Sequence, residues 1–399
     1  MKDRILHMTQ EGLCPQEQLC EICKNAESLC IGLPKEGYKK EKRFPLTPEA
    51  VAILTKAGIH VIIESQAGIS INYSDLLYAE SGAEITDEKA MVFQADIILK
   101  ITPITVEEAN LIKPGATVVS LFQPQYQNGE AIQVLLQKRI VAMAFDEITD
   151  EENHRIFADI LDEIDGRAAM VTASYLLSNS SGGKGILMGG IPGIAPAEVV
   201  ILGAGLAGRA AAISALGQGA MVRLFDNNVP RLRNASDLLG THIFTSTLHP
   251  KVLKHALEAA DVVIGTSCDT QFILPEEEIK KMKKGALLID LCIGKGGCFE
   301  TSNCPNSPQD KIFEKFEILH YCLSSIGSSV ARTASMALSN LFLPILLDIA
   351  DKNGIANKIK TDPGFRRAIY LLNGKVVNRE IAQRFNLPFC DIALFIAIF

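Results

Sequence analysis

The chain has 399 residues, of which 48% are hydrophobic and 21% charged, and its formal net charge is −7. This length is enough for two domains, and the acidic balance excludes the basic surface that nucleic-acid-binding proteins present. The counts of 30 glycines and 17 prolines are ordinary, which excludes collagen-like and low-complexity chains.

The hydropathy pattern predicts neither a membrane span nor a signal peptide. The most apolar stretch, 341–350, is shorter than the ~20 residues that cross a bilayer and contains Pro344 and Asp348. The N-terminus, MKDRILHMTQ, lacks the apolar core of a secretory signal. We therefore expect a soluble, cytoplasmic protein without a membrane or nucleic-acid partner.

Residues 1–30 form an N-terminal extension that is rich in cysteine. Cys20 and Cys23 have the spacing of zinc ligands, and Cys14 and Cys30 would complete a tetrahedral set. The other spacings match no zinc finger, so we favour a polar extension with cysteines placed by chance and predict no metal site. Cytoplasmic cysteines are expected to be mostly reduced thiols.

From residue 31 the chain alternates between strands and helices. Short apolar runs rich in valine and isoleucine, separated by helical segments, are typical of a buried parallel sheet. In the first part of the chain we expect a helix over 47–56 and strands over 60–64, 96–100 and 116–122.

A glycine-rich stretch at 178–193 is predicted to be a loop. It resembles a linker, but we place it inside the second domain because the strand expected next needs a sheet to join. Strands are expected there at 199–202, 221–225, 261–265 and 286–290.

The most specific motif is GAGLAG at 203–208, between a predicted strand and a predicted helix. This context is the one that a dinucleotide-binding turn requires. Gly203 would allow the tight turn, Gly205 would let a pyrophosphate approach, and Gly208 would let helix and strand pack closely. The helix N-terminus would offer its N–H groups to the phosphates.

A carboxylate ends the next strand. Asp226 lies 18 residues beyond Gly208, close to the ~20 of the motif, and would bind the adenosine ribose hydroxyls. It would repel a 2′-phosphate, which favours NAD over NADP, although Arg231 would weaken that preference. The alternative is a glycine turn without a ligand. The predicted cofactor contacts are Gly203, Ala204, Gly205, Leu206, Gly208 and Asp226.

Other motifs occur in a fixed order along the chain. They are GLPKE at 32–36, RFPLTP at 43–48, ADIILK at 95–100, GKG to GGIPG at 183–193, GGCFETS at 296–302, HYC at 320–322 and VART at 330–333. Together they resemble one family: alanine dehydrogenase and the homologous soluble domain of the alpha subunit of nicotinamide nucleotide transhydrogenase. The resemblance covers about residues 31–390.

The resemblance implies an α/β fold with two Rossmann-like, doubly wound domains and a site in the cleft between them. The substrate domain would be discontinuous, residues 31–156 plus 332–399, and the NAD-binding domain would be residues 157–331. A homo-oligomer is also implied, a hexamer as in alanine dehydrogenase or a dimer as in the transhydrogenase domain. The apolar tail at 392–399 is expected to be buried, in the core or at a subunit contact.

Two catalytic residues follow from the resemblance. The family's arginine that binds the substrate carboxylate falls on Arg43, whose guanidinium suits a bidentate carboxylate. The family's substrate-site lysine falls on Lys100, whose ammonium would polarise the keto oxygen or stabilise an alkoxide. For an isolated arginine or lysine, an ordinary ion pair is the alternative interpretation.

Other positions depart from the family pattern. Gln123 replaces the catalytic histidine and cannot exchange a proton near neutral pH. Gly294 replaces the catalytic aspartate, and Ser325 replaces an asparagine near the nicotinamide. The segment 120–128 is closer to the transhydrogenase sequence. Residues that could take over proton transfer are Tyr126, Asp290, His320 and Lys100; His320 matches a structural position, and Cys298 has no base beside it.

The favoured function is therefore an NAD-dependent amino-acid dehydrogenase that converts L-alanine, NAD and water to pyruvate, ammonium and NADH, or acts on a related 2-oxo acid. One alternative is transhydrogenase-type hydride exchange with partner chains, because direct hydride transfer needs no acid or base from the protein. The other alternative is an NAD-binding homologue without catalytic activity.

Overall fold

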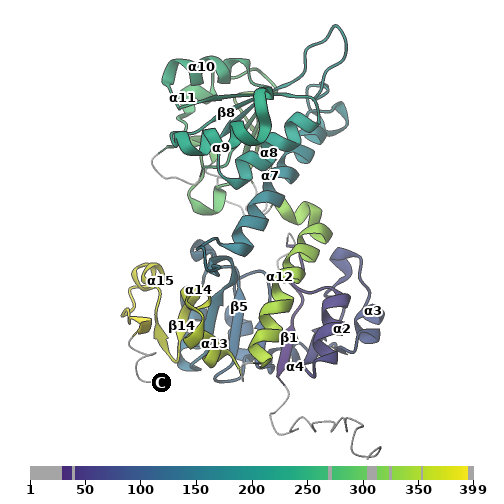
Figure 1. The fold of residues 1–399 in the computed structure, drawn as a ribbon, viewed down its shortest axis with the longest axis vertical. Coiled ribbons are helices and arrows are strands. Elements are labelled where there is room, and N and C mark those ends of the chain that lie inside the picture. Colours follow the sequence, from purple (N-terminus) through teal and green to yellow (C-terminus); the bar gives the residue numbers. More distant parts are fainter. Residues whose placement is uncertain are drawn as a thin grey trace, which may run out of the picture.

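The computed structural model describes residues 29–37, 41–267, 272–302, 312–322, 326–351 and 354–393, and the statements below concern these residues. They form two α/β domains, which two long helices connect (Figure 1). Each domain contains one predominantly parallel sheet with helices on its faces. The predicted fold class of two doubly wound domains is confirmed.

The described residues form a first sheet of eight strands in the order β15-β14-β6-β5-β4-β1-β2-β3. Strands β1 to β6 are parallel, whereas β14 and β15 are added antiparallel at one edge. The bounds are β1 Cys30–Leu33, β2 His60–Glu64, β3 Glu84–Thr86, β4 Ile97–Leu99, β5 Thr117–Ser120, β6 Val141–Ala144, β14 Ile369–Leu372 and β15 Lys375–Val376.

The second sheet has seven strands among the described residues, in the order β12-β13-β11-β10-β7-β8-β9. All pairings are parallel except that of β12 with β13. The bounds are β7 Glu198–Leu202, β8 Met221–Phe225, β9 Ile243–Ser246, β10 Val262–Gly265, β11 Leu287–Asp290, β12 Ile312–Lys315 and β13 Ile318–Tyr321.

The central strands are buried on both faces, which is why they read as continuous apolar runs in the sequence. In β4, β7 and β10 almost every side chain is fully buried. The expected strands agree with the observed ones to within two residues at each end, and the helix expected over 47–56 is α2. The loop predicted at 178–193 lies between α7 and β7.

Both sheets have the same topology. The chain adds three strands in one direction and then returns to the other side of its first strand, so that β1 lies beside β4 and β7 lies beside β10. In open α/β sheets, ligands bind at the carboxyl ends of the strands at such a switch point. The fold therefore provides two places for ligands, one in each domain.

The helices cover the sheets and join the domains. Their bounds are α2 Pro48–Lys56, α3 Asp75–Glu80, α4 Lys89–Phe93, α5 Val106–Leu111, α6 Gly129–Gln137, α7 Ile156–Leu176, α8 Leu206–Gly217, α9 Val229–Leu239, α10 Pro250–Ala259, α11 Glu276–Ile279, α12 Ala331–Asp351, α13 Ile355–Thr361, α14 Pro363–Arg367 and α15 Arg379–Arg384. Helices α7 and α12 run between the two domains and pack on each other (Figure 1).

Helix α7 approaches α8 very closely at Gly166. A Cβ atom added at Gly166 would lie 2.1 Å from the backbone oxygen of Ala207, a separation that real atoms do not adopt. Glycine is therefore required where α7 crosses the first turn of α8. This contact fixes the connecting helix on the opening of the second domain's first helix.

One helix of the described chain, Ile326–Asp351, is long and apolar enough to cross a membrane by length and composition. Pro344 lies inside this helix without ending it. Leu338, Phe342 and Leu346 are buried in the core of the first domain. A core helix passes the same length and composition test.

Several predictions fall on residues that the structure does not describe. Cys14, Cys20 and Cys23 lie outside the described residues, so the two interpretations of the N-terminal extension stay open. Cys30 begins β1. In the apolar tail, Ile392 packs against the core of the first domain, and residues 394–399 lie outside the described part.

Candidate active site

The glycine motif forms the turn between β7 and α8. Gly203 has φ of +110°, and a Cβ atom there would lie 2.6 Å from Oγ1 of Thr266. A Cβ atom at Gly208 would lie 1.9 Å from the backbone oxygen of Gly203, whereas one at Gly205 would meet nothing within 4 Å. Two glycines are thus required by the fold, and the third leaves space against the backbone.

That space continues into a pocket of about 570 Å³. Gly205 is the N-cap of α8 and forms no side-chain hydrogen bond there, so the first N–H groups of the helix remain available for an anion. The pocket is lined by residues of the glycine turn, by Thr266 and Ser267, and by Arg155, Asp159, Asp162, Arg209, Arg231 and Asn234. Its shape and donors fit a pyrophosphate.

Asp226 lies at the end of β8 and is 8% exposed. Its Oδ2 accepts a hydrogen bond from the Ala204 N–H at 2.7 Å, and its Oδ1 accepts one from the Asn228 N–H at 2.7 Å. It lines an adjoining pocket of about 390 Å³ together with Arg231, whose Nη1 is 3.9 Å from Oδ2. The carboxylate therefore braces the turn and faces a second pocket, which has room for an adenosine.

Arg43 is buried in the first domain, with 4% of its surface exposed. Its Nε and Nη2 donate to the two carboxylate oxygens of Glu41 at 2.8 and 2.7 Å. Burial alone would lower the pKa of Arg43, but the Glu41 carboxylate raises it above its ordinary value, so the guanidinium stays charged. Within the described chain Nη1 has no hydrogen-bond partner and remains available for a ligand.

Lys100 follows β4 and is 1% exposed. Its Nζ lies 2.8 Å from Oε2 of Glu108, and Glu108 also forms a capping box with Thr105 at the start of α5. Burial favours a higher pKa for Glu108, but Lys100 outweighs this and the net pKa is lowered. The capping box thus orients the carboxylate that holds the lysine.

Glu36 connects the two strands of the first switch point. It follows β1, and its carboxylate accepts hydrogen bonds from the N–H groups of Ile101 and Thr102 and from the Thr102 hydroxyl, all just after β4. Burial raises its pKa, although Lys100 opposes the shift. Glu36 lines a pocket of about 240 Å³ together with Glu41 and Arg43. This pocket lies where the topology predicts a ligand.

The fold adds a carboxyl group that the sequence analysis did not single out. Asp165, on α7, accepts a hydrogen bond at Oδ1 from the Gly327 N–H at 2.8 Å. Burial raises the pKa of Asp165 to about 7, against the opposing charge of Arg43. The residue as a whole is partly exposed. Burial therefore favours the protonated form of this carboxyl group more than in an ordinary aspartate.

Comparison with known proteins now identifies the family. The N-terminal domain of alanine dehydrogenase/PNT matches residues 32–161, and the C-terminal domain matches residues 169–379. The chain belongs to the alanine dehydrogenase/PNT family. Both switch points described above lie inside these two matches.

Two relatives and two solved structures illustrate the similarity. The chain is 33% identical to "Alanine dehydrogenase" of Mycolicibacterium smegmatis, over 92% of this chain and 100% of the relative. It is 33% identical to "Alanine dehydrogenase" of Methanococcus maripaludis, over 90% of this chain and 98% of the relative. An L-alanine dehydrogenase structure matches with a TM-score of 0.83 and 28% identity, over 90% of this chain and 99% of that one. A transhydrogenase from Sinorhizobium meliloti, with a TM-score of 0.72, 21% identity and coverage of 88% and 99%, shows the fold alone.

Two positions where this chain departs from the family pattern are visible in the structure. Gln123 has a left-handed backbone, φ 31° and ψ 65°, three residues after the end of β5, an unusual conformation for a residue other than glycine. Gly294 lies in a short 3-10 turn, Ile293–Lys295, after β11. Neither position supplies an imidazole or a carboxylate. Ser325 lies outside the described residues.

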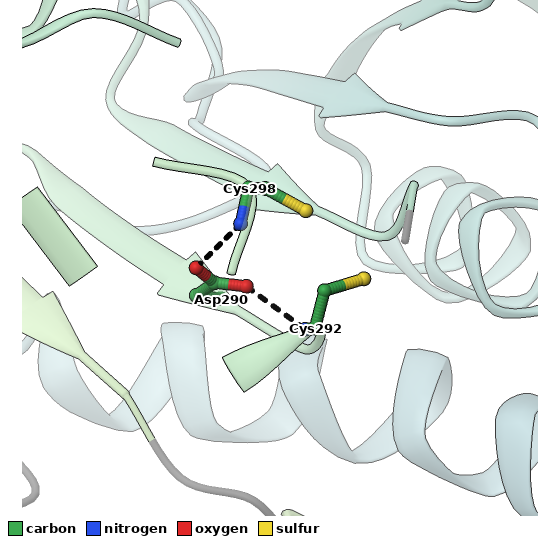
Figure 2. A group of neighbouring side chains, drawn as sticks. All are labelled: Asp290, Cys292 and Cys298. Carbon is green, nitrogen blue, oxygen red and sulfur yellow. Dashed lines mark hydrogen bonds between the residues drawn. The ribbon is translucent and has the colours of Figure 1, made fainter. Parts of the chain in front are cut away.

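Asp290 is held as a structural clamp (Figure 2). Its oxygens accept hydrogen bonds from the N–H groups of Cys292 and Cys298, both at 2.8 Å, and from the Ser302 hydroxyl. Burial raises its pKa. These three donors close the loop after β11 and leave the carboxyl group poorly placed to meet a substrate.

The same three residues, Asp290, Cys292 and Cys298, are the group of potential metal ligands that the described residues bring together, with ligand atoms within 4.8 Å of one another. Cys292 is disulfide-bonded, whereas Cys30, Cys298, Cys322 and Cys390 carry thiols, so most of the cysteines that the structure describes are reduced, as expected. A disulfide sulfur and a carboxylate with three donors are poor metal ligands. The group fits a structural role better than a metal site.

The other residues considered for proton transfer or nucleophilic attack differ in burial and in hydrogen bonding. His320 is fully buried; its Nε2 pairs with the Thr301 hydroxyl and its Nδ1 with the Ile318 carbonyl, each at 2.9 Å. Burial lowers its pKa. Burial raises the pKa of the Cys298 thiol, which opposes nucleophilic behaviour. Tyr126 is about half exposed.

Sequence reasoning missed four acidic residues of the site: Glu36, Glu41, Glu108 and Asp165. For Glu36 a signal existed, because the residue ends the GLPKE motif at 32–36. Glu108 carried the signature of a capping box, three residues after Thr105. Glu41 and Asp165 had no comparable pattern in the sequence.

Proposed function

We propose that this chain is an NAD-dependent amino-acid dehydrogenase, with L-alanine and pyruvate as the first substrate pair to test. The reaction would convert L-alanine, NAD⁺ and water to pyruvate, ammonium, NADH and a proton. The observation that carries the proposal is Arg43: a buried guanidinium, held by Glu41 on one side, keeps Nη1 available at a pocket. A small 2-oxo acid or amino acid offers the carboxylate that such a donor binds.

The roles of the site residues follow from their chemistry. Arg43 would bind the substrate carboxylate, and the Lys100 ammonium would stabilise negative charge on the carbonyl oxygen. Both lie on the side of the first sheet where β1 and β4 end. Glu41 and Glu108 would hold these two cations in place when no substrate is bound.

The second switch point would hold the cofactor. The open space at Gly205 and the unpaired N–H groups of α8 support a pyrophosphate there, and Asp226 beside the adjoining pocket supports NAD rather than NADP. The dinucleotide, when bound, supplies the acceptor for the hydride that leaves Cα. Gly203, Ala204, Leu206 and Gly208 would position it through backbone and packing.

We also propose the division into a substrate domain, residues 31–156 plus 332–399, and an NAD-binding domain, residues 157–331. It is supported by the strands near the C-terminus, β14 and β15, which extend the first sheet. A homo-oligomer, hexameric or dimeric, is part of the same proposal.

The test is NADH consumption by the purified chain with pyruvate and ammonium. Arg43→Lys is the matched control, because lysine keeps the charge that Glu41 requires but lacks the planar fork of donors. Turnover that falls in Arg43→Lys while NADH affinity is kept would support the proposal. No turnover with any small 2-oxo acid would contradict it, and NADH binding or nucleotide exchange would then favour the alternatives.

A further inference from the structure

We propose that Asp165 is the residue that exchanges the proton with the substrate in this reaction. The inference rests on the proposed dehydrogenase function and extends it, because neither Gln123 nor Gly294 offers a proton-transfer group. Addition of water to an imine and release of ammonia both require a group that takes up a proton and returns it.

Asp165 lies between the two ligand places. Asp162 and Asp159, about one and two turns before it on α7, line the phosphate pocket, and spacings of three place all three aspartates along one side of the helix. The next residue, Gly166, contacts Ala207 at the start of α8. Helix α7 thus brings the Asp165 carboxyl group next to the cofactor side of the molecule.

Asp165 is also connected to the segment that carries Arg43, through the turn around Gly327. Its donor, the Gly327 N–H, precedes Ser328, whose hydroxyl accepts a hydrogen bond from the Lys42 N–H at 2.8 Å. This contact ties the turn around Gly327 to the segment that carries Arg43. Burial raises the pKa of Asp165, and the positive charge of Arg43 opposes this shift in part. The electrostatic interaction agrees with the connection through Gly327 and Lys42.

The remaining acids and bases of the site are occupied. Lys100 is paired with Glu108, Glu36 is held by Ile101 and Thr102, and Asp290 has three donors. In contrast, Oδ2 of Asp165 has no hydrogen-bond partner among the described residues. The residue as a whole is partly exposed. Asp165 therefore has a carboxylate oxygen that is available to a substrate or a water molecule.

The neutral amine of the substrate loses hydride from Cα, which leaves an iminium ion. Water then attacks Cα, and as the C–O bond forms Asp165 takes one proton from this water, which gives a carbinolamine. Asp165 returns that proton to the amino nitrogen, the C–N bond breaks, and ammonia leaves. The hydroxyl proton is released as the C=O bond forms, and ammonium and the 2-oxo acid result.

The expected pH dependence follows from the surroundings of Asp165. The titratable and charged groups that face it are Arg43 and Glu41 from the segment before α2, Asp162 on α7, and Tyr321 on β13. Alanine oxidation requires the carboxylate form, so kcat/KM should rise with pH through a midpoint of about 7. In Asp165→Asn this rise should be absent.

The experiment compares Asp165→Asn with wild-type protein in alanine oxidation across this pH range. A general acid–base group contributes about 10²- to 10⁴-fold, so kcat should fall by that factor while NADH affinity, measured by fluorescence, is kept. Asp165→Glu should restore part of the activity. Glu163→Gln removes an exposed carboxylate from the same helix, paired with Arg167, and should behave as wild type.

A second readout does not depend on activity. In cofactor-free protein labelled with ¹³C at the aspartate carboxyl carbons, the Asp165 resonance is the one that Asp165→Asn lacks, and it should titrate near pH 7. A titration midpoint near the ordinary pKa of aspartate would overturn the inference about Asp165. An Asp165→Asn variant with wild-type kcat and pH profile would overturn it too. Either result would leave the proposed dehydrogenase function standing. Wild-type protein that turns over no 2-oxo acid would overturn the proposed function, and the inference with it.

Discussion

The two switch points of this molecule offer different kinds of groups to a ligand. At the second, between β7 and β10, the binding groups are backbone N–H groups and a missing side chain at Gly205. At the first, between β1 and β4, they are the buried charges of Arg43 and Lys100, each paired with a glutamate. Backbone dipoles require no counter-charge without ligand, whereas buried charges do. The pairs Glu41–Arg43 and Lys100–Glu108 are therefore part of the fold as well as of the site.

The sharpest test of this difference is Arg43→Ala. It leaves the Glu41 carboxylate buried without its partner, which should reduce the free energy of unfolding by about 3–5 kcal/mol, measured by urea denaturation. The double variant Glu41→Ala, Arg43→Ala removes both charges and should recover most of this loss. A double variant as unstable as the single one would mean that packing, rather than charge pairing, holds this region.

At the glycine turn, stability and NADH affinity should depend on the volume of an added side chain and not on its charge. Gly208→Ala places a Cβ atom against the Gly203 oxygen and should lower the free energy of unfolding by about 1–3 kcal/mol. Gly205→Ala meets open space, so stability should change little while the Kd for NADH rises about tenfold or more, equivalent to ~1.4 kcal/mol. Thermal melting and NADH fluorescence separate the two effects. Equal loss of stability in both variants would contradict the assignment.

Asp165 provides a test of stability against pH. Because its pKa rises from the ordinary 3.8 to about 7 in the fold, the stability it contributes is complete below about pH 4 and is lost as the pH rises through 7. Asp165→Asn keeps the acceptor for Gly327 without the charge, so it should be more stable than wild type at pH 8, by about 1–2 kcal/mol after allowance for partial exposure. The two proteins should converge near pH 4. A variant less stable at pH 8 would contradict this.

The smallest effect is expected from Asp226→Asn at the adenosine pocket, on the preference between NAD⁺ and NADP⁺. Asp226→Asn removes the charge but keeps one acceptor for the Ala204 N–H, and it leaves the guanidinium of Arg231, which is largely exposed, without its carboxylate partner. The ratio of kcat/KM for NADP⁺ to that for NAD⁺ should rise about tenfold, or ~1.4 kcal/mol. An unchanged ratio would show that Arg231 does not reach a 2′-phosphate.

The fold and the cofactor turn could be predicted because their signals are local. A buried parallel strand such as β7 is a continuous apolar run, and the turn at 203–208 is a contiguous pattern between strand and helix. The family motifs also identified Arg43 and Lys100 as residues of interest. Each of these features is contained in a few consecutive residues.

The acidic residues Glu41 and Asp165 could not be predicted in the same way. Asp165 has its hydrogen-bond donor at Gly327, 162 residues away, and only the packing of α7 on the second domain brings them together. Glu41 precedes Arg43 by two residues in a loop, where no periodicity marks a pair.

The close contact at Gly166 also bears on how this chain tolerates change. Any side chain there would push α7 away from Ala207, and the displacement would reach the cofactor turn on one side and the next residue, Asp165, on the other. In a saturation mutagenesis screen, position 166 should accept almost no replacement, although glycine has no reactive side chain. The packing of two helices would thus limit sequence change at this position.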